Sequence, residues 1–148
     1  MQSRIIPDIV DEQKLCTLSE SHTVHQAAQK MAASDVAAII VLDAENHLAG
    51  ILTERDLTRR VLAEGLNGDK TILSEVMTKN PDTLAPNDIA MDALELMQAR
   101  KYRHLPVVDG DNVVGMVSIR DLYAAVKRTL ELDIQETEAF VFGDRYSA

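Results

Sequence analysis

The spacing of apolar residues changes several times along the first half of the chain, and each change predicts a new structural element. One face of an amphipathic helix is indicated by four residues with helical spacing, Val24, Ala27, Ala28 and Met31. Residues 36–42 are entirely apolar, as in a buried strand, and residues 48–52 return after a polar turn as its partner. The remaining predicted elements are a helical turn at 5–10, a strand at 15–18 and a helix at about 54–63.

The second half of the chain repeats this pattern. A second helical stripe is formed by Ala90, Ala93, Leu94 and Met97. The elements around it are a helical turn at 72–77, strands at 83–84, 105–108 and 113–117, and a helix opened by Ser118. Met31 and Met97 lie 66 positions apart, as do Asp43 and Asp109. Self-similarity on this scale predicts two homologous units.

We therefore predict an α/β (α+β) fold of two pseudo-symmetric β-α-β-β-α repeats. The first repeat is expected at residues 5–64 and the second at 72–128. A linker at 65–71, marked by two glycines and polar residues, separates them, and residues 129–148 form a C-terminal helix or tail.

One phrase occurs in both repeats, GILTERDL at residues 50–57 and GMVSIRDL at 115–122. A strand is expected to end there and a helix to begin, and the free N–H groups of a helix start attract anions. Thr53 or Ser118 could contact a phosphate, and Asp56 or Asp121 offers acceptors for a ribose diol.

The same residues could form a capping box, which needs no ligand. The duplication favours a ligand site, because a cap requires neither the glycine nor the arginine that both copies carry.

Composition and charge restrict the possible partners. Hydrophobic residues make up 46% of the chain and aromatic residues only 3%, so the core is expected to be aliphatic and rich in methionine. The net charge of −9 argues against nucleic acid or an anionic membrane as partner. The chain starts without an apolar leader, and its longest apolar run, at 36–42, is too short to span a bilayer. Cys16 is the single cysteine, so no intrachain disulfide can form, and we expect a buried thiol and a cytoplasmic protein.

The sequence contains no recognisable catalytic or metal-binding motif. His22 and His25 are three positions apart, but no third ligand follows at a useful spacing. A nucleophile elbow, a glycine-rich phosphate loop and a Cys/His pair are all missing. We expect a protein that is not an enzyme, holds no metal and requires no cofactor.

The repeated architecture, the doubled phrase and residues 103–109 (RHLPVVD) together resemble the cystathionine β-synthase (CBS) domain. The resemblance covers roughly residues 5–128 and is to the tandem form called a Bateman module. It implies two repeats packed sheet to sheet, with clefts that bind adenosine-containing ligands such as AMP, ADP, ATP, NAD(H) or S-adenosylmethionine. It also implies a regulatory role, with an adenine nucleotide as ligand and an effector protein as reader.

Carried over residue by residue, the resemblance assigns Thr53 and Asp56 to one cleft and Ser118 and Asp121 to the other. It further implies ligand contacts, near the base or the phosphates, for Thr17, Ala37, Ala38, Arg55, Thr83, Arg103, His104, Pro106 and Arg120. Arg103 and His104 are expected to make the second cleft cationic, where the first has only the two alanines.

Family modules typically form flat dimers, so a homodimer is expected. The tail holds Phe140, Phe142 and Tyr146, and a disordered tail would not usually concentrate aromatic residues. We expect it to pack on its own module or on a second copy, with these side chains near the interface. The main alternative to a ligand sensor is a structural module that dimerises and leaves its clefts empty; an enzyme acting on nucleotides is the third possibility.

Overall fold

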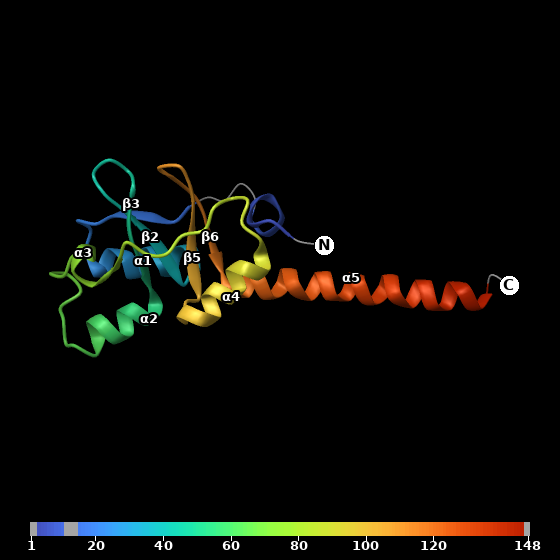
Figure 1. Ribbon diagram of the computed structural model, residues 1–148. Helices are drawn as coiled ribbons and strands as arrows, with labels where there is room; N and C mark the ends of the chain where they lie inside the picture. The colour runs from blue at the N-terminus through green and yellow to red at the C-terminus, as the bar shows by residue number, and fades with distance from the viewer. Residues whose placement is uncertain (1–2, 11–14, 147–148) are drawn as a thin grey trace.

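The computed structural model describes residues 3–10 and 15–146, with side chains described up to Val141. Two sheets with their helices form a two-part body, and one long helix projects from it (Figure 1). The expected mixed α/β fold is confirmed.

The first sheet has four strands in the order β1 (Thr17–Ser19), β2 (Ala38–Leu42), β3 (Leu48–Thr53) and β4 (Thr78–Lys79). β1 is parallel to β2, and the other neighbours are antiparallel. The parallel pair is connected through α1 (Val24–Ser34), which begins with a capping box between Thr23 and Gln26 and ends where Asp35 adopts a left-handed conformation. The predicted helix stripe and hairpin of the first repeat are therefore confirmed.

The second sheet contains β5 (His104–Asp109) and β6 (Asn112–Ser118), with α4 (Ala90–Arg100) packed against α5 (Ile119–Tyr146) beside it. The strand expected at 83–84 is reduced to one parallel bridge between Leu84 and Val107. Pro81 and Pro86 flank this bridge, and proline has no N–H to donate to a ladder, so pairing cannot spread far in either direction.

The leading segment of each repeat packs on the other repeat. The short helical segment η1 (Ile5–Ile9) joins the second repeat: the Ile5 N–H donates to the Asp88 carbonyl at 2.9 Å, and the Ile5 side chain is fully buried in that core. Conversely α3 (Leu73–Val76) joins the first repeat, where the Leu73 N–H donates to the His22 carbonyl at 2.9 Å. This exchange ties the two repeats into one body.

Two aliphatic clusters form the core, as the composition predicts. The first repeat encloses its cluster around Met31, Ile39 and Leu52, and the second around Met97, Leu105 and Leu122. Cys16 is only half-buried, at the margin of the first cluster, so the expectation of a buried thiol is wrong. Among the described residues, no helix is both long and apolar enough to cross a membrane.

Each repeat ends in a helix that follows its copy of the doubled phrase. After β3 the chain continues as α2 (Glu54–Asp56) and η2 (Leu57–Leu62), close to the predicted range of 54–63. After β6 it continues as α5, which leaves the body and extends away from it (Figure 1).

The expectation that the tail packs on its own module is wrong for the residues whose side chains are described. Every side chain from Leu130 to Val141 is exposed, and that of Phe140 is 72% exposed. The side chains of Phe142 and Tyr146 lie outside the described part.

Candidate functional site

Both copies of the doubled phrase form a capping box. The Thr53 N–H donates to Oδ2 of Asp56 at 3.0 Å, and the Asp56 N–H donates back to Oγ1 of Thr53 at 3.2 Å. Ser118 and Asp121 make the same pair of bonds at 3.0 and 3.1 Å. A carboxylate accepts about four hydrogen bonds, so each aspartate can cap its helix and still accept from a ligand.

The glycine of the first copy has a packing role. A Cβ atom built on Gly50 would lie 2.6 Å from the Thr78 carbonyl oxygen and 2.7 Å from Sδ of Met77. Only a residue without a side chain lets β4 approach β3 this closely. The close approach of β4 therefore explains Gly50 without a ligand. The presence of this glycine no longer favours a ligand site over a simple capping box.

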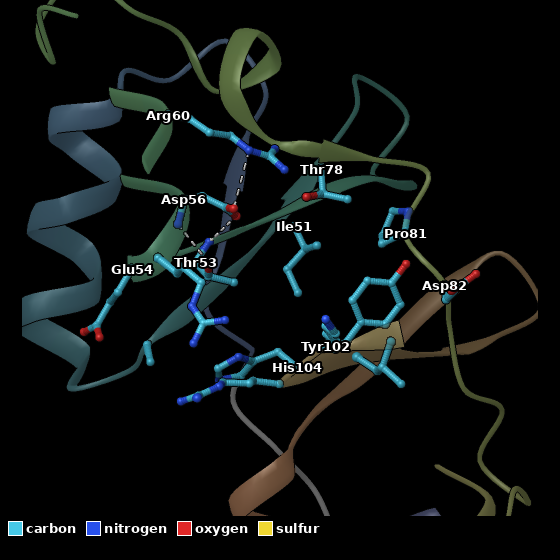
Figure 2. A pocket seen from close by; sticks show the side chains of 15 residues that line it. Ile51, Thr53, Glu54, Asp56, Arg60, Thr78, Pro81, Asp82, Tyr102 and His104 are labelled. Carbon is cyan, nitrogen blue, oxygen red and sulfur yellow. Dashed lines mark hydrogen bonds and ion pairs between the residues drawn. The ribbon is translucent and has the colours of Figure 1, made fainter. Parts of the chain in front are cut away.

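The first cavity, of about 380 Å³, lies where the start of α2 meets the segment that leads into β5 (Figure 2). Its polar rim combines Thr53 and Asp56 with Arg103 and His104 from the second repeat. The remaining lining residues are Ala37, Ile51, Glu54, Arg55, Arg60, Thr78, Pro81, Asp82, Lys101, Tyr102 and Leu105. Four of these fifteen residues are permanent cations, against three acidic residues, although the chain as a whole is strongly acidic.

Arg60 stabilises one wall of the first cavity through two contacts. Its Nη1 donates to the Val76 carbonyl at 2.9 Å, and its Nε lies 3.6 Å from Oδ1 of Asp56 (Figure 2). The Asp56 side chain is only 15% exposed. Its Oδ2 is held by the capping box and its Oδ1 by Arg60.

Asp82 lines the first cavity on the side that carries Pro81 and Tyr102 (Figure 2). Its Oδ2 atom is buried and lies 3.4 Å from Nη1 of Arg100, without a hydrogen bond to any described residue. A buried acceptor of this kind is costly unless something donates to it. The charge of Arg100 partly compensates this cost, and the ion pair holds Asp82 in the cavity wall.

The second cavity, of about 810 Å³, opens at the start of α5. Ser118, Arg120 and Asp121 lie on one side of it and Ala37 and Ala38 on the other. The rest of its lining is Leu15, Cys16, Met31, Ala32, Asp35, Val36, Ile40, Glu54, Arg103, His104, Met116 and Ile119. It contains two arginines and three acidic residues, so its charge balance is opposite to that of the first cavity.

The structure assigns the sequence-predicted residues to the two cavities differently from expectation. Arg103 and His104 line both cavities rather than the second alone, and Ala38 lines the second rather than the first. The physical reason is the stacking of the repeats, which places the strand entrance of one repeat opposite the helix start of the other. The Thr53 cavity is consequently the more cationic one.

Three predicted residues line neither cavity. Thr17 lies in β1, where its carbonyl accepts from Nζ of Lys30, and Thr83 is exposed. Pro106 is fully buried inside β5.

Several lining residues were missed by sequence reasoning. Arg60, Lys101, Tyr102 and Asp82 all line the first cavity. Arg60 could have been found from its position four residues after Asp56, and Tyr102 from its place directly before Arg103 and His104. Asp82 carried no such signal, because its position depends on how the segment after β4 crosses the second repeat.

His104 lies in the wall between the cavities, and its surroundings perturb it. Burial is the largest effect and lowers its pKa from the ordinary 6.5; Arg103 acts in the same direction, while Asp121 and Glu54 partly oppose them. The imidazole is therefore neutral at neutral pH.

The described residues contain no group of three or more His, Cys, Asp or Glu side chains that could hold a metal ion. With two clefts lined by hydroxyl, carboxylate and guanidinium groups, the arrangement is suited to binding a polar organic ligand.

Comparison with known proteins agrees with this architecture. The family model for the CBS domain matches residues 3–63 and 73–128. The CBS domain-containing protein CBSCBSPB2 from Arabidopsis thaliana is 40% identical over 116 residues, which are 78% of this chain and 22% of the plant protein. The chain thus spans little more than a fifth of the length of that relative.

Solved structures are also similar. A CBS-domain containing protein from Agrobacterium tumefaciens superposes with a TM-score of 0.73 at 30% identity, over 80% of this chain and 90% of that one. A CBS domain protein from Pyrobaculum aerophilum, complexed with AMP, gives a TM-score of 0.70 at 26% identity, over 76% and 86% of the two chains. The chain described here belongs to the CBS domain family and carries two CBS domains in tandem.

Proposed function

We propose that this chain is a regulatory module that binds an adenosine-containing nucleotide in the first cavity. The observation that carries the proposal is the meeting of a capped helix start with four permanent cations at the junction of the repeats. Such a set of groups complements phosphate and ribose together. The AMP complex of the Pyrobaculum relative supports the same ligand class.

The lining of the first cavity divides into two parts that suit the two ends of a nucleotide. Ile51, Pro81, Tyr102 and Leu105 offer apolar and aromatic surface to a base. Arg55, Lys101 and Arg103 offer charge to phosphate groups. Its volume of about 380 Å³ lies within the range of roughly 300–1,000 Å³ that is usual for small-molecule sites.

Charge is the basis for distinguishing the two cavities. The second is larger, but Asp35, Glu54 and Asp121 outnumber its two arginines. We infer that phosphate-rich ligands prefer the first cavity, whereas the second depends more on burying the nucleoside.

The two cavities share one wall, and this couples them. Ala37, Glu54, Arg103 and His104 line both. When the guanidinium of Arg103 binds a phosphate in one cavity, it is not available to the other cavity. Filling either cavity therefore lowers the affinity of the other for phosphate.

A regulatory role fits these features better than catalysis, with the nucleotide as regulatory ligand and an effector protein as reader. We also expect a homodimer. The competing proposal, a structural module with empty clefts, is favoured by one observation, since both capping boxes are complete without a ligand.

Thermal unfolding with AMP, ADP, ATP, NAD(H) and S-adenosylmethionine separates the two proposals. A ligand at about 100 times its Kd adds roughly 2.7 kcal/mol to the free energy of unfolding, which raises the melting temperature by several degrees. We expect such a shift with at least one nucleotide. An unchanged melting temperature with every compound at millimolar concentration would favour the structural module.

A further inference from the structure

The part of α5 beyond the body carries large apolar side chains that nothing in the described structure covers. Leu122 and Val126 pack into the second core, but every side chain from Leu130 to Val141, the part of the extension whose side chains are described, is exposed. The helix itself projects away from the body (Figure 1). A lone helical extension of this kind is marginally stable in water, because most helix stability in proteins comes from packing an apolar face. We therefore expect the apolar side chains of this extension to pack against a partner.

Four of the exposed apolar residues form one narrow stripe along α5. Tyr123, Leu130, Ile134 and Val141 are 50%, 56%, 57% and 49% exposed. Their separations of seven, four and seven residues are those of a coiled-coil seam, and Lys127 and Thr137 occupy the two seam positions between them. We call these six residues the α5 seam.

The α5 seam is symmetric about position 132. In an antiparallel pair of identical helices, Tyr123 of one copy would face Val141 of the other, and Leu130 would face Ile134. Lys127 would face Thr137. Apolar residues thus meet apolar residues at every seam position except 127 and 137, so that the helix is complementary to a second copy of itself.

Charge selects the antiparallel arrangement. Lys127 and Arg128 lie at the end nearer the body, whereas the stretch 130–141 carries only acidic charges, Glu131, Asp133, Glu136 and Glu138. A parallel pair would place all four acidic residues against their own copies, whereas the antiparallel pair leaves only Glu131 of one copy facing Asp133 of the other. An antiparallel pair brings Glu138 of one copy to Lys127 of the other.

From this pattern we propose that α5 is an assembly element that binds α5 of a second copy of this chain as an antiparallel helix pair through the α5 seam. The two bodies then lie at opposite ends of the paired helices. Leu132 takes no part, because it is two residues from both Leu130 and Ile134 and so lies on the opposite side of the helix. The inference does not depend on the proposed ligand.

A matched pair of variants tests the surface. Ile134→Asp places a charge in the seam, and Leu132→Asp places the same charge on the opposite side at nearly equal exposure, 57% against 55%. Light scattering at micromolar concentration should give a dimer mass for the wild type and for Leu132→Asp, and a monomer mass for Ile134→Asp. Both positions lie outside the two cores, so an unchanged thermal transition of the body confirms folding.

A monomeric wild type, or a dimer that survives Ile134→Asp, would overturn the proposal. Loss of the dimer in both variants would also overturn it, since the two sides of the helix would then be equivalent.

Disulfide trapping tests the orientation. In a Cys16→Ser background, Lys127→Cys and Thr137→Cys are made as separate proteins. Each variant is oxidised alone, and a mixture of the two reduced variants is oxidised in parallel. The antiparallel pair predicts a covalent dimer only in the mixture, where residue 127 of one copy faces residue 137 of the other. Efficient cross-linking of either variant with itself would show a parallel pair and contradict the proposal.

Discussion

His104 illustrates how a single side chain can respond to both cavities. Its ring is held among Asp121, Glu54 and Arg103, in a wall that both ligands would touch. Burial, the largest effect, lowers its pKa below 6.5, so the folded protein resists its protonation.

This pKa shift has a defined consequence for stability. Because the unfolded chain takes up the proton first, the contribution of His104 is fully present above pH 6.5 and decreases as the pH falls from 6.5 through the lower pKa of the folded state. Chemical denaturation of the wild type and His104→Gln between pH 5 and pH 8 should show the two stability curves diverging in slope below that point. His47→Gln, which alters an exposed turn residue, is the control. Parallel curves for the wild type and His104→Gln would contradict the assignment.

Gly50 provides a second test on the scale of one residue. A Cβ atom at 2.6 Å from a backbone oxygen cannot be accommodated unless β4 moves, and overpacking of this kind costs about 1–3 kcal/mol. We expect Gly50→Ala to lower the urea midpoint accordingly. Gly68→Ala is the matched control, because its nearest neighbour would be 3.7 Å away. Equal midpoints for the two variants would show that β4 does not constrain this position.

At the scale of elements, helical and strand spacing predicted most of the body. The stripes on α1 and α4 and the β2–β3 and β5–β6 hairpins all lie where the apolar pattern placed them. These elements are local, so the sequence of each segment contains the information that determines it. The capping boxes were recognisable for the same reason.

The elements that could not be predicted depend on contacts between distant segments. Residues 5–9 and 73–76 each look like the first turn of their own repeat, yet each packs on the other one. Leu84 has the residue type of a strand, but the prolines beside it limit its pairing to a single bridge.

The surface that packs against the last helix could not be predicted either. The sequence predicts a C-terminal helix or tail at 129–148 that packs on its own module or on a second copy, whereas the described side chains from Leu130 to Val141 are exposed on α5. Helical periodicity alone does not show whether an apolar face packs within a chain or between chains.

At the scale of the whole molecule, the composition of each cavity follows from how the repeats stack. The sequence identified Thr53, Asp56, Arg103 and His104 as candidates, but it could not show that all four share one cavity. That pairing requires knowing which helix start faces which strand entrance.

The net charge of −9 makes this local arrangement significant. A cluster of cations in an acidic protein attracts a nucleotide only at short range, since exposed charges are screened over about 8–10 Å at physiological ionic strength. Nucleotide affinity should therefore depend on the few cations of the first cavity rather than on the protein's overall field.

Calorimetric titration with ATP and with adenosine, on the wild type, Arg103→Ala and Arg59→Ala, tests this central claim most directly. Both substitutions remove one exposed arginine, but only Arg103 lines a cavity. The account predicts that Arg103→Ala weakens ATP binding roughly tenfold, or about 1.4 kcal/mol, leaves adenosine binding nearly unchanged, and that Arg59→Ala alters neither. An ATP affinity that is the same in all three proteins, or that falls equally in both variants, would contradict it.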